Sequence, residues 1–538
     1  MKNKKSIAII LIFITLTMMF FTYKVTITYD TSHYLWLTSL LTPNGDFSTW
    51  DVARSIIFPL FIRVSNMLFG YSTTGILVGM YIFYIIMIVT CYFIYKDTIK
   101  EEKCCSKTMK CILGILFFVL IAINPMIFGY YHTLLTEFFG ITLAMLGCYL
   151  SWKWMDVNFK ENKVKYSIYT IILALLVAIA WHLKQPYVST ILFPIIISAI
   201  LSFIRNTSIK NFLQRAITII ICIIVLAGSI KLWNTVLEKN DVQIKADRTS
   251  EGFLSSGIIG GITEYSKKNK EEFDTAEKVN NNEKLNQNDK EKMTEILNNN
   301  SEDKSFIVID TKKKKYDVIY AKGETLSTGE AVKYLLSTMA KDPKAIIGSY
   351  TTNYLATTSL YNIEFEGMDI IINKKLNFTN TAEISAIGFR MYEPEVDNVF
   401  PLSEELEPYA AVYRETNAPI KIVNIVMKNM EIPVTIVMKL SYLMLPILTI
   451  LSIISVFVTK KKYNEKYRKI IDIIVILYTF SILHILVHSV LGAIIDRYTM
   501  PALATTFMAI MLSIYTIVYR KKYKVNNNKE LGKENKNE

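Results

Sequence analysis

Stretches of about twenty consecutive apolar residues recur along the chain and are separated by short polar segments. About twenty residues of α-helix cross the hydrocarbon layer of a bilayer, so each stretch predicts a membrane-spanning helix. The first stretch follows a basic start and has bulky residues behind it, so we interpret it as a retained span and not as a cleaved signal peptide. The pattern predicts about ten spans, at 6–23, 75–95, 111–129, 133–152, 166–183, 187–204, 216–235, 435–458, 470–491 and 499–519.

One further apolar segment, 56–69, is too short to cross a bilayer and contains Pro59, Arg63 and Asn66. Its apolar residues fall on one helical face, so we expect a helix that lies in the membrane interface. If the segment crossed instead, the lysine-rich loop 96–110 would move to the outer side, against the rule that short cytoplasmic loops carry the basic residues.

Composition and charge agree with this topology. Of the 538 residues, 51% are hydrophobic, and the mean hydropathy is +0.30. The formal net charge is +13, and the lysines and arginines concentrate in alternate connections, beginning with the amino terminus. This predicts a multi-pass protein of the cell membrane with cytoplasmic termini and the long loop outside. Because the basic residues are scattered between spans, we expect no nucleic-acid partner.

The long polar segment between the two blocks of spans changes character along its length. Residues 264–305 are rich in Lys, Glu, Asn and Asp, which predicts a solvated insert that is partly helical or disordered. Alternation of apolar and polar residues in 305–320 predicts a β-hairpin, and the patterns of 328–340 and 345–360 predict helices. We therefore expect a mixed α/β domain. The six cysteines lie outside this segment, which argues against a disulfide framework.

The domain organisation follows from these patterns. We expect a transmembrane core at 1–235 with interfacial helices in its first outer loop (24–74), an extracytoplasmic domain at 236–434, transmembrane helices at 435–520 and a polar cytoplasmic tail at 521–538.

Ionisable side chains within or beside spans are costly, so each is a candidate functional residue. In the predicted topology they gather at the outer ends of the spans, which predicts a polar cavity open to that side. The residues are Asp30, His33, Arg54, His132, Glu137, His182, Lys184, His484, His488 and Arg497.

Simpler roles stay open for several of these residues. Asp30 could be only the N-cap of a short helix, and Asp51 the cap of the interfacial helix. Arg54 and Lys184 could reach lipid headgroups. The pair His484 and His488 fits a packed helix interface better than a metal site. Glu137, one turn into a span, needs a partner, for which His132 and Lys184 are available.

Three stretches, in chain order, carry a resemblance to a known superfamily. The first is Tyr-Asp-Thr-Ser-His-Tyr at 29–34, followed by Arg-Ser-Ile-Ile-Phe-Pro-Leu-Phe at 54–61 and Leu-Phe-Gly-Tyr-Ser at 68–72. The second runs from Asn-Pro at 124–125 to Leu-Leu-Thr-Glu at 134–137, and the third is Asp-Arg-Tyr-Thr-Met-Pro at 496–501. Together they resemble the GT-C membrane glycosyltransferases, which include protein O-mannosyltransferases and the aminoarabinose transferases of lipid A. The chain departs from the family at Thr31, where a second acidic residue is usual.

The resemblance covers 1–235 and 435–520 and implies a GT-C-like, all-α polytopic fold. It implies transfer of a sugar from a polyprenyl-phosphate donor to an envelope glycan, lipid or protein acceptor on the extracytoplasmic side. Asp30 would be the general base and Glu137 a second catalytic residue. No cofactor is certain, and a divalent metal remains an option. The substrate-binding residues implied are His33, Arg54, Tyr131, His132, Lys184, Arg497 and Tyr498.

Three other functions remain open. A polymerase or ligase of lipid-linked glycans would share the outer cavity and would depend on arginines of the long loop instead of Asp30. A transporter would be expected to show paired halves with interrupted spans, and the charged residues here gather at one surface and not at mid-bilayer. A non-catalytic scaffold would tolerate substitution of Glu137 and Arg497.

Overall fold

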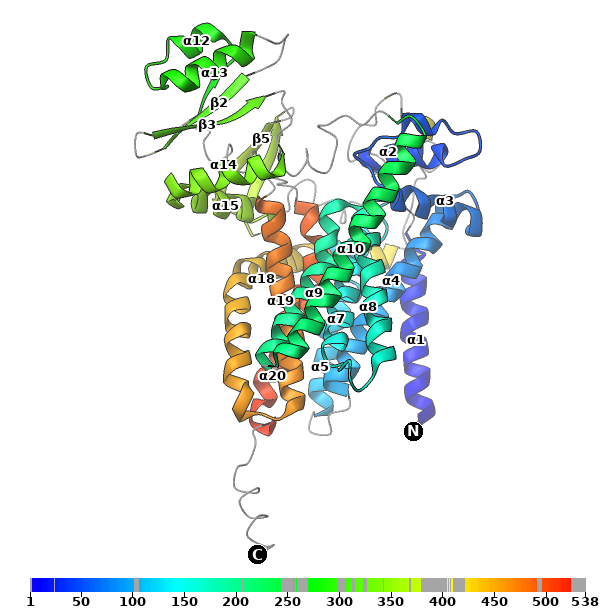
Figure 1. Ribbon diagram of the computed structural model, residues 1–538. Coiled ribbons are helices and arrows are strands. Elements are labelled where there is room, and N and C mark those ends of the chain that lie inside the picture. Colours follow the sequence, from blue (N-terminus) through cyan, green and yellow to red (C-terminus); the bar gives the residue numbers. More distant parts are fainter. Residues whose placement is uncertain are drawn as a thin grey trace, which may run out of the picture.

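The fold is given by a computed structural model of the chain. It describes residues 2–23, 25–100, 106–205, 208–242, 255, 258, 270–298, 305–311, 315–322, 327–341, 343–366, 369–378, 404, 406, 408–409, 421–490 and 496–523. Most of these residues are helical, and the long helices stand side by side in one bundle (Figure 1). The predicted tail 521–538 lies outside the described residues beyond Tyr523.

Eight helices in the described ranges have the length and apolar composition needed to cross a membrane. They occupy eight of the predicted positions, which confirms a multi-pass, predominantly helical membrane protein. They contain α4 (Thr73–Tyr95), α5 (Lys107–Phe117) with the short α6 (Pro125–Tyr130), α8 (Lys163–Leu183), α9 (Ser189–Arg205), α10 (Ile209–Lys239), α18 (Lys421–Lys462), α19 (Glu465–Val490) and α20 (Met500–Tyr519).

The two other predicted spans are also helices but are not among these eight. The first, α1 (Lys2–Phe20), runs along the edge of the bundle, and the second, α7 (Glu137–Met155), runs through its interior (Figure 1). Residues along nearly the whole length of α7 are buried, because α4, α9 and α20 pack around it. The charged first residue of α7, Glu137, is therefore enclosed by protein and not by lipid.

A glycine lets α7 and α9 approach closely. A Cβ atom at Gly147 would lie 2.3 Å from the carbonyl oxygen of Thr190, a distance that real Cβ atoms do not adopt. Small residues at helix contacts of this kind are typical of membrane bundles. The contact fixes α7 relative to the start of α9, and Lys184 lies just before the short 3₁₀ helix η4 (Gln185–Val188) that leads into α9.

Two short helices, α2 (Tyr29–Leu40) and α3 (Ile57–Phe69), cover one end of the bundle (Figure 1). The 3₁₀ helix η1 (Phe47–Thr49) lies between them in the chain. One face of α3 is buried, at Phe58 and Ile62, whereas Met67 and Leu68 on the other face are 67% and 69% exposed. An apolar face left uncovered by protein suits a helix in the membrane interface, as predicted.

Strands and helices of the long loop lie at the same end of the bundle as α2 and α3 (Figure 1). The predicted hairpin is present as antiparallel β2 (Ser305–Thr311) and β3 (Lys315–Lys322), with β1 (Lys270–Phe273) paired to β2. Next come α14 (Thr328–Lys341) and α15 (Pro343–Thr357), both at predicted positions, and the antiparallel pair β4 (Tyr361–Glu366) and β5 (Asp369–Leu376).

The helix α15 joins the loop to the bundle. The side-chain amide of Asn353 donates to the carbonyl of Ser489 in α19 at 3.1 Å, and the hydroxyl of Tyr354 donates to the carbonyl of Tyr442 in α18 at 2.8 Å. Both donors come from one helical turn, so α15 is held over the ends of two spans.

The insert predicted at 264–305 contains β1, α12 (Ala276–Asn280) and α13 (Gln287–Asn298), and its remaining residues lie outside those described. Because β1 completes a sheet, removal of 264–305 would cut a strand from β2. Replacement of 275–298, which contains only α12 and α13, by a short Gly-Ser linker leaves that sheet whole. We expect this variant to reach the membrane at wild-type levels and to elute as one peak in detergent on size-exclusion chromatography. Aggregation or loss of the protein would show that these helices support the fold.

Candidate functional site

A short backbone pairing fixes the helix that carries Asp30. The backbone N–H of Thr26 donates to the carbonyl of His132 at 2.6 Å, and that of Leu134 donates to the carbonyl of Thr26 at 3.1 Å. The hydroxyl of Thr31 adds a hydrogen bond to the carbonyl of Leu134 at 2.9 Å. The start of α2 is thus attached to the segment that leads into α7, which brings Asp30 near Glu137.

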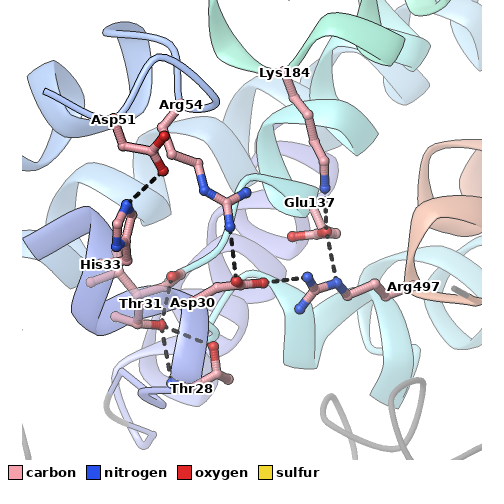
Figure 2. Close-up of polar contacts among 10 residues, drawn as sticks. Thr28, Asp30, Thr31, His33, Asp51, Arg54, Glu137, Lys184 and Arg497 are labelled. Carbon is pink, nitrogen blue, oxygen red and sulfur yellow. Dashed lines mark hydrogen bonds and ion pairs between the residues drawn. The ribbon is translucent and has the colours of Figure 1, made fainter. Parts of the chain in front are cut away.

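The Asp30 carboxylate lies between two guanidinium groups (Figure 2). Arg54 Nη2 is 3.1 Å from Asp30 Oδ1, and Arg497 Nη2 donates to Asp30 Oδ2. The N-cap of α2 is Thr28. Asp30 lies in the first turn of the helix, and its carboxylate pairs with the side chains of Arg54 and Arg497. The N-cap interpretation of Asp30 is therefore wrong.

This environment controls the charge of Asp30. Burial alone would raise the pKa of its carboxyl, but the guanidiniums of Arg497 and Arg54 outweigh burial and hold that pKa well below its usual range. Asp30 is therefore ionised at neutral pH. Because the folded pKa lies below that of the unfolded chain, about 4, the ion pairs contribute stability above that pH and lose it as the pH falls further.

Glu137 has two cationic neighbours. Its Oε1 lies 3.4 Å from Lys184 Nζ and 3.5 Å from Arg497 Nε, while its Oε2 is buried without a hydrogen-bond partner in the described part of the chain. Of the two partners proposed from sequence, Lys184 is present and His132 is not. Arg497 thus bridges both carboxylates through different nitrogen atoms (Figure 2).

Tyr498 completes the cluster on the side of Lys184. The ammonium of Lys184 lies 3.6 Å from the centre of the Tyr498 ring, and the guanidinium of Arg497 lies 5.5 Å from it. The backbone carbonyl of Tyr498 in turn contacts His484 Nε2 at 3.1 Å, and His484 Nδ1 contacts Ser189 Oγ at 2.8 Å. His484 therefore holds Tyr498 and α9 together, and the ring of His488 packs edge-on against His484 and at a tilt against Tyr498 in the same interface. His484 and His488 therefore lie in a packed helix interface, which the sequence favoured over a metal site for this pair.

His33 lies beside the cluster but contacts a different carboxylate. Its Nε2 is 3.0 Å from Asp51 Oδ2, and Asp51 Oδ1 accepts from the backbone N–H of Ala53 at 3.0 Å. Asp51 therefore caps a turn before α3, which begins at Ile57, and the prediction that it caps α3 is wrong. Burial raises the pKa of Asp51, and the hydrogen bonds from His33 and Ala53 lower it further than burial raises it.

Two further predicted site residues, Tyr131 and His132, lie outside the cluster. Tyr131 is fully buried, and its hydroxyl is 2.6 Å from Thr142 Oγ1 in α7. Both ring nitrogens of His132 lie 2.8 Å from backbone carbonyls, those of Phe128 and Phe20. These contacts tie α1, α6 and α7 together, so in this structure both side chains serve the packing beneath the site.

Sequence reasoning missed two aromatic residues at the site. Tyr34 lies under the guanidinium of Arg54, with 5.4 Å between the ring centre and Cζ. Tyr187 is fully buried, with its ring centre 5.6 Å from Lys184 Nζ. A signal existed for Tyr34, because it follows Asp30 by four residues and so shares its helical face.

The hydroxyl of Thr31 binds two backbone groups at the start of α2. It accepts from the backbone N–H of Thr28 at 3.0 Å and donates to Leu134, and the side chain is fully buried. Thr31→Val would leave both backbone groups unsatisfied, so we expect a loss of about 1–3 kcal/mol of stability and a lower midpoint of thermal unfolding in detergent. Thr31→Ser keeps the hydroxyl and is the matched control. Equal midpoints for the two variants would contradict this role.

The assembled site joins three cations, Arg54, Lys184 and Arg497, to two carboxylates, Asp30 and Glu137, with one positive charge in excess. Such a site suits an anionic group beside a hydroxyl that must lose a proton. Within the described residues, no cluster of three or more His, Cys, Asp and Glu side chains could hold a metal ion.

Comparison with known proteins adds no relative. No protein-family model, no curated protein and no solved structure matches this chain.

Proposed function

We propose that the protein is a membrane glycosyltransferase that moves a sugar from a polyprenyl-phosphate carrier to an envelope acceptor. The observation that carries the proposal is the cluster in which Asp30 lies between Arg54 and Arg497, with Glu137 and Lys184 joined through Arg497. These residues come from five separate parts of the chain and meet at one end of a membrane bundle. The motifs that resemble the GT-C superfamily supply four of the five.

The carrier's phosphate would meet the cationic side of this cluster. A sugar linked through one phosphate carries a single negative charge, which equals the excess positive charge of the site. Arg54 and Arg497 would bind the phosphate oxygens and stabilise the charge that develops as the sugar leaves. Lys184, held over Tyr498 beside Arg497, would add a third cation for the same group.

Asp30 would accept the proton of the acceptor hydroxyl. In the transfer, the acceptor oxygen forms a bond to the anomeric carbon, the bond from that carbon to the phosphate oxygen breaks with its electron pair, and the hydroxyl proton passes to Asp30. The two guanidiniums make Asp30 a weak base in the free enzyme. When the phosphate takes their hydrogen bonds, the carboxylate loses that stabilisation and becomes more basic, so donor binding would activate it.

Glu137 would position the apparatus. Its carboxylate is almost fully buried, with 1% of the side chain exposed, and it holds both Lys184 and Arg497. Removal of this charge would free two cations to move. The extracytoplasmic domain, docked through α15 over α18 and α19, would then select the acceptor, since that acceptor has to reach the same end of the bundle.

Analysis of lipids and envelope polymers from a deletion strain tests the function. We expect the carrier-linked sugar to accumulate and one envelope product to lose that sugar, with both reversed by the wild-type gene and not by the Asp30→Asn variant. Complementation by Asp30→Asn together with failure of variants at Arg248, Arg390 or Arg414, which lie in the long loop outside the described residues, would favour a polymerase or ligase instead.

A further inference from the structure

A second polar site lies at the opposite end of the bundle from Asp30. The helix α7 runs from Glu137 at the first site to Met155 at the other end, which separates the two ends by about 27 Å along the helix axis. There a cavity of about 300 Å³ opens between the ends of α7, α9, α10 and α19. Topology from charge places this end in the cytoplasm. Its basic lining consists of Arg205, Arg215, Arg468 and Lys469.

Three carboxylates line the same cavity, and each is paired. Arg205 Nη2 lies 2.8 Å from Asp472 Oδ1, a pair of which 13% and 4% of the side chains are exposed. Lys469 Nζ lies 3.3 Å from Asp156 Oδ2 and 3.0 Å from Glu465 Oε1. These contacts use two of the four cations and leave Arg215 and Arg468 without a carboxylate partner among the described residues.

The two remaining arginines differ in what they can offer a ligand. Arg215 already binds the end of α7, because its Nη atoms donate hydrogen bonds to the carbonyls of Trp154, Met155 and Val157 at 2.6–2.9 Å. Among the described residues, the Arg468 side chain makes one long hydrogen bond, 3.5 Å from Nη1 to the carbonyl of Lys460. Its Nε is buried and has no hydrogen-bond partner within the described part of the chain.

Other features of the cavity favour an anion. With four basic and three acidic side chains, the lining has one positive charge in excess. The amides of Asn211 and Gln214, on the first two turns of α10, also line it, and α19 begins there at Glu465 with Arg468 in its first turn. The amino-terminal ends of two helices therefore lie at the cavity beside the partly buried Arg468, whose Nε atom is itself buried, an arrangement that favours phosphate oxygens.

We propose that this cavity binds the phosphate group of an anionic ester through Arg468, at the end of the bundle opposite the sugar-transfer site. The ester is either the headgroup of an anionic phospholipid or a small soluble phosphate. Both present the same chemistry to Arg468, and they differ in whether a bilayer is needed.

Two probes of the full-length protein distinguish these sources. The first is inorganic phosphate titrated against delipidated protein in detergent, followed by the midpoint of thermal unfolding. The second is phosphatidylglycerol in nanodiscs of phosphatidylcholine, followed by native mass spectrometry of retained lipid. A response to phosphate identifies a soluble ligand, and a response to phosphatidylglycerol alone identifies the headgroup.

Two variants that change the charge of the cavity lining in opposite directions test the role of Arg468. Arg468→Gln is expected to weaken the response about tenfold, because a charge-assisted hydrogen bond is lost. Asp156→Asn, which raises the excess charge of the lining, should strengthen it, and this arm remains informative if Arg468→Gln folds poorly. Lys462→Gln changes an exposed basic residue near the same end and should have no effect.

The proposals for the two sites can be tested independently of each other. Anion binding near Asp30 would respond to Arg497→Lys and not to Arg468→Gln, so failure of either proposal leaves the other standing. The cavity proposal is overturned if neither probe gives a response that depends on Arg468, or if Lys462→Gln weakens it as much as Arg468→Gln does.

Discussion

Substitution Asp30→Asn is expected to abolish sugar transfer, with a loss of at least about 10³-fold in kcat, while the amount of protein in the membrane stays unchanged. The amide cannot take a proton from the acceptor hydroxyl, and it cannot pair with two guanidiniums. The fold should survive, because Arg497 keeps Glu137 as a partner and 30% of the Arg54 side chain is exposed to solvent. The measurement is transfer of sugar from purified polyprenyl-phosphate sugar by protein in nanodiscs.

The matched control is Asp46→Asn in the same loop. Asp46 accepts from the backbone N–H of Ser48 at 3.1 Å and from the Ser48 hydroxyl at 2.7 Å, an acceptor role that an asparagine keeps, and it does not touch the cluster. We expect this variant to transfer sugar at the wild-type rate. Full activity of Asp30→Asn would remove Asp30 from the chemistry and leave it as part of an ion pair only.

The sequence was sufficient to place the candidate site at one end of the bundle. Asp30, Glu137, Lys184 and Arg497 fall at the same ends of their spans because spans alternate in direction and basic loops set the orientation. It was not sufficient to pair them. Glu137 had two proposed partners, and the bridge through Arg497 depends on how α7 and α20 pack, which hydropathy along the chain does not encode.

Because hydropathy along the chain does not encode packing, it also could not show which predicted site residues lie away from the cluster. Tyr131 and His132 lie within the second motif stretch (124–137), but the turn after α6 directs both side chains into the bundle, where they bind Thr142 and two carbonyls. Likewise, α7 is not among the eight membrane-crossing candidates, because its composition is less apolar, with Glu137 at its start and Lys153 near its end. Burial by neighbouring helices relaxes the need for a purely apolar sequence.

Replacement of Arg497 by lysine is expected to lower kcat by about 10²-fold while the protein remains folded. The guanidinium reaches Asp30 through Nη2 and Glu137 through Nε, so one rigid planar group sets the positions of both carboxylates. A lysine keeps the charge, which maintains the balance of the cluster, but its single nitrogen cannot hold both partners in this geometry. Loss of positioning without loss of charge should therefore appear in turnover and not in the midpoint of thermal unfolding.

Arg54→Lys is the matched comparison, because Arg54 contacts only one of the two carboxylates, Asp30, through Nη2. A lysine can reproduce a single contact, so we expect a loss of tenfold or less in kcat, at most about 1.4 kcal/mol in the barrier. Both variants keep the excess positive charge, and a difference between them isolates the bridge from the charge. If Arg54→Lys lost as much turnover as Arg497→Lys, the bridge between Asp30 and Glu137 would have no special part in catalysis, and the two arginines would act only as cations beside the phosphate.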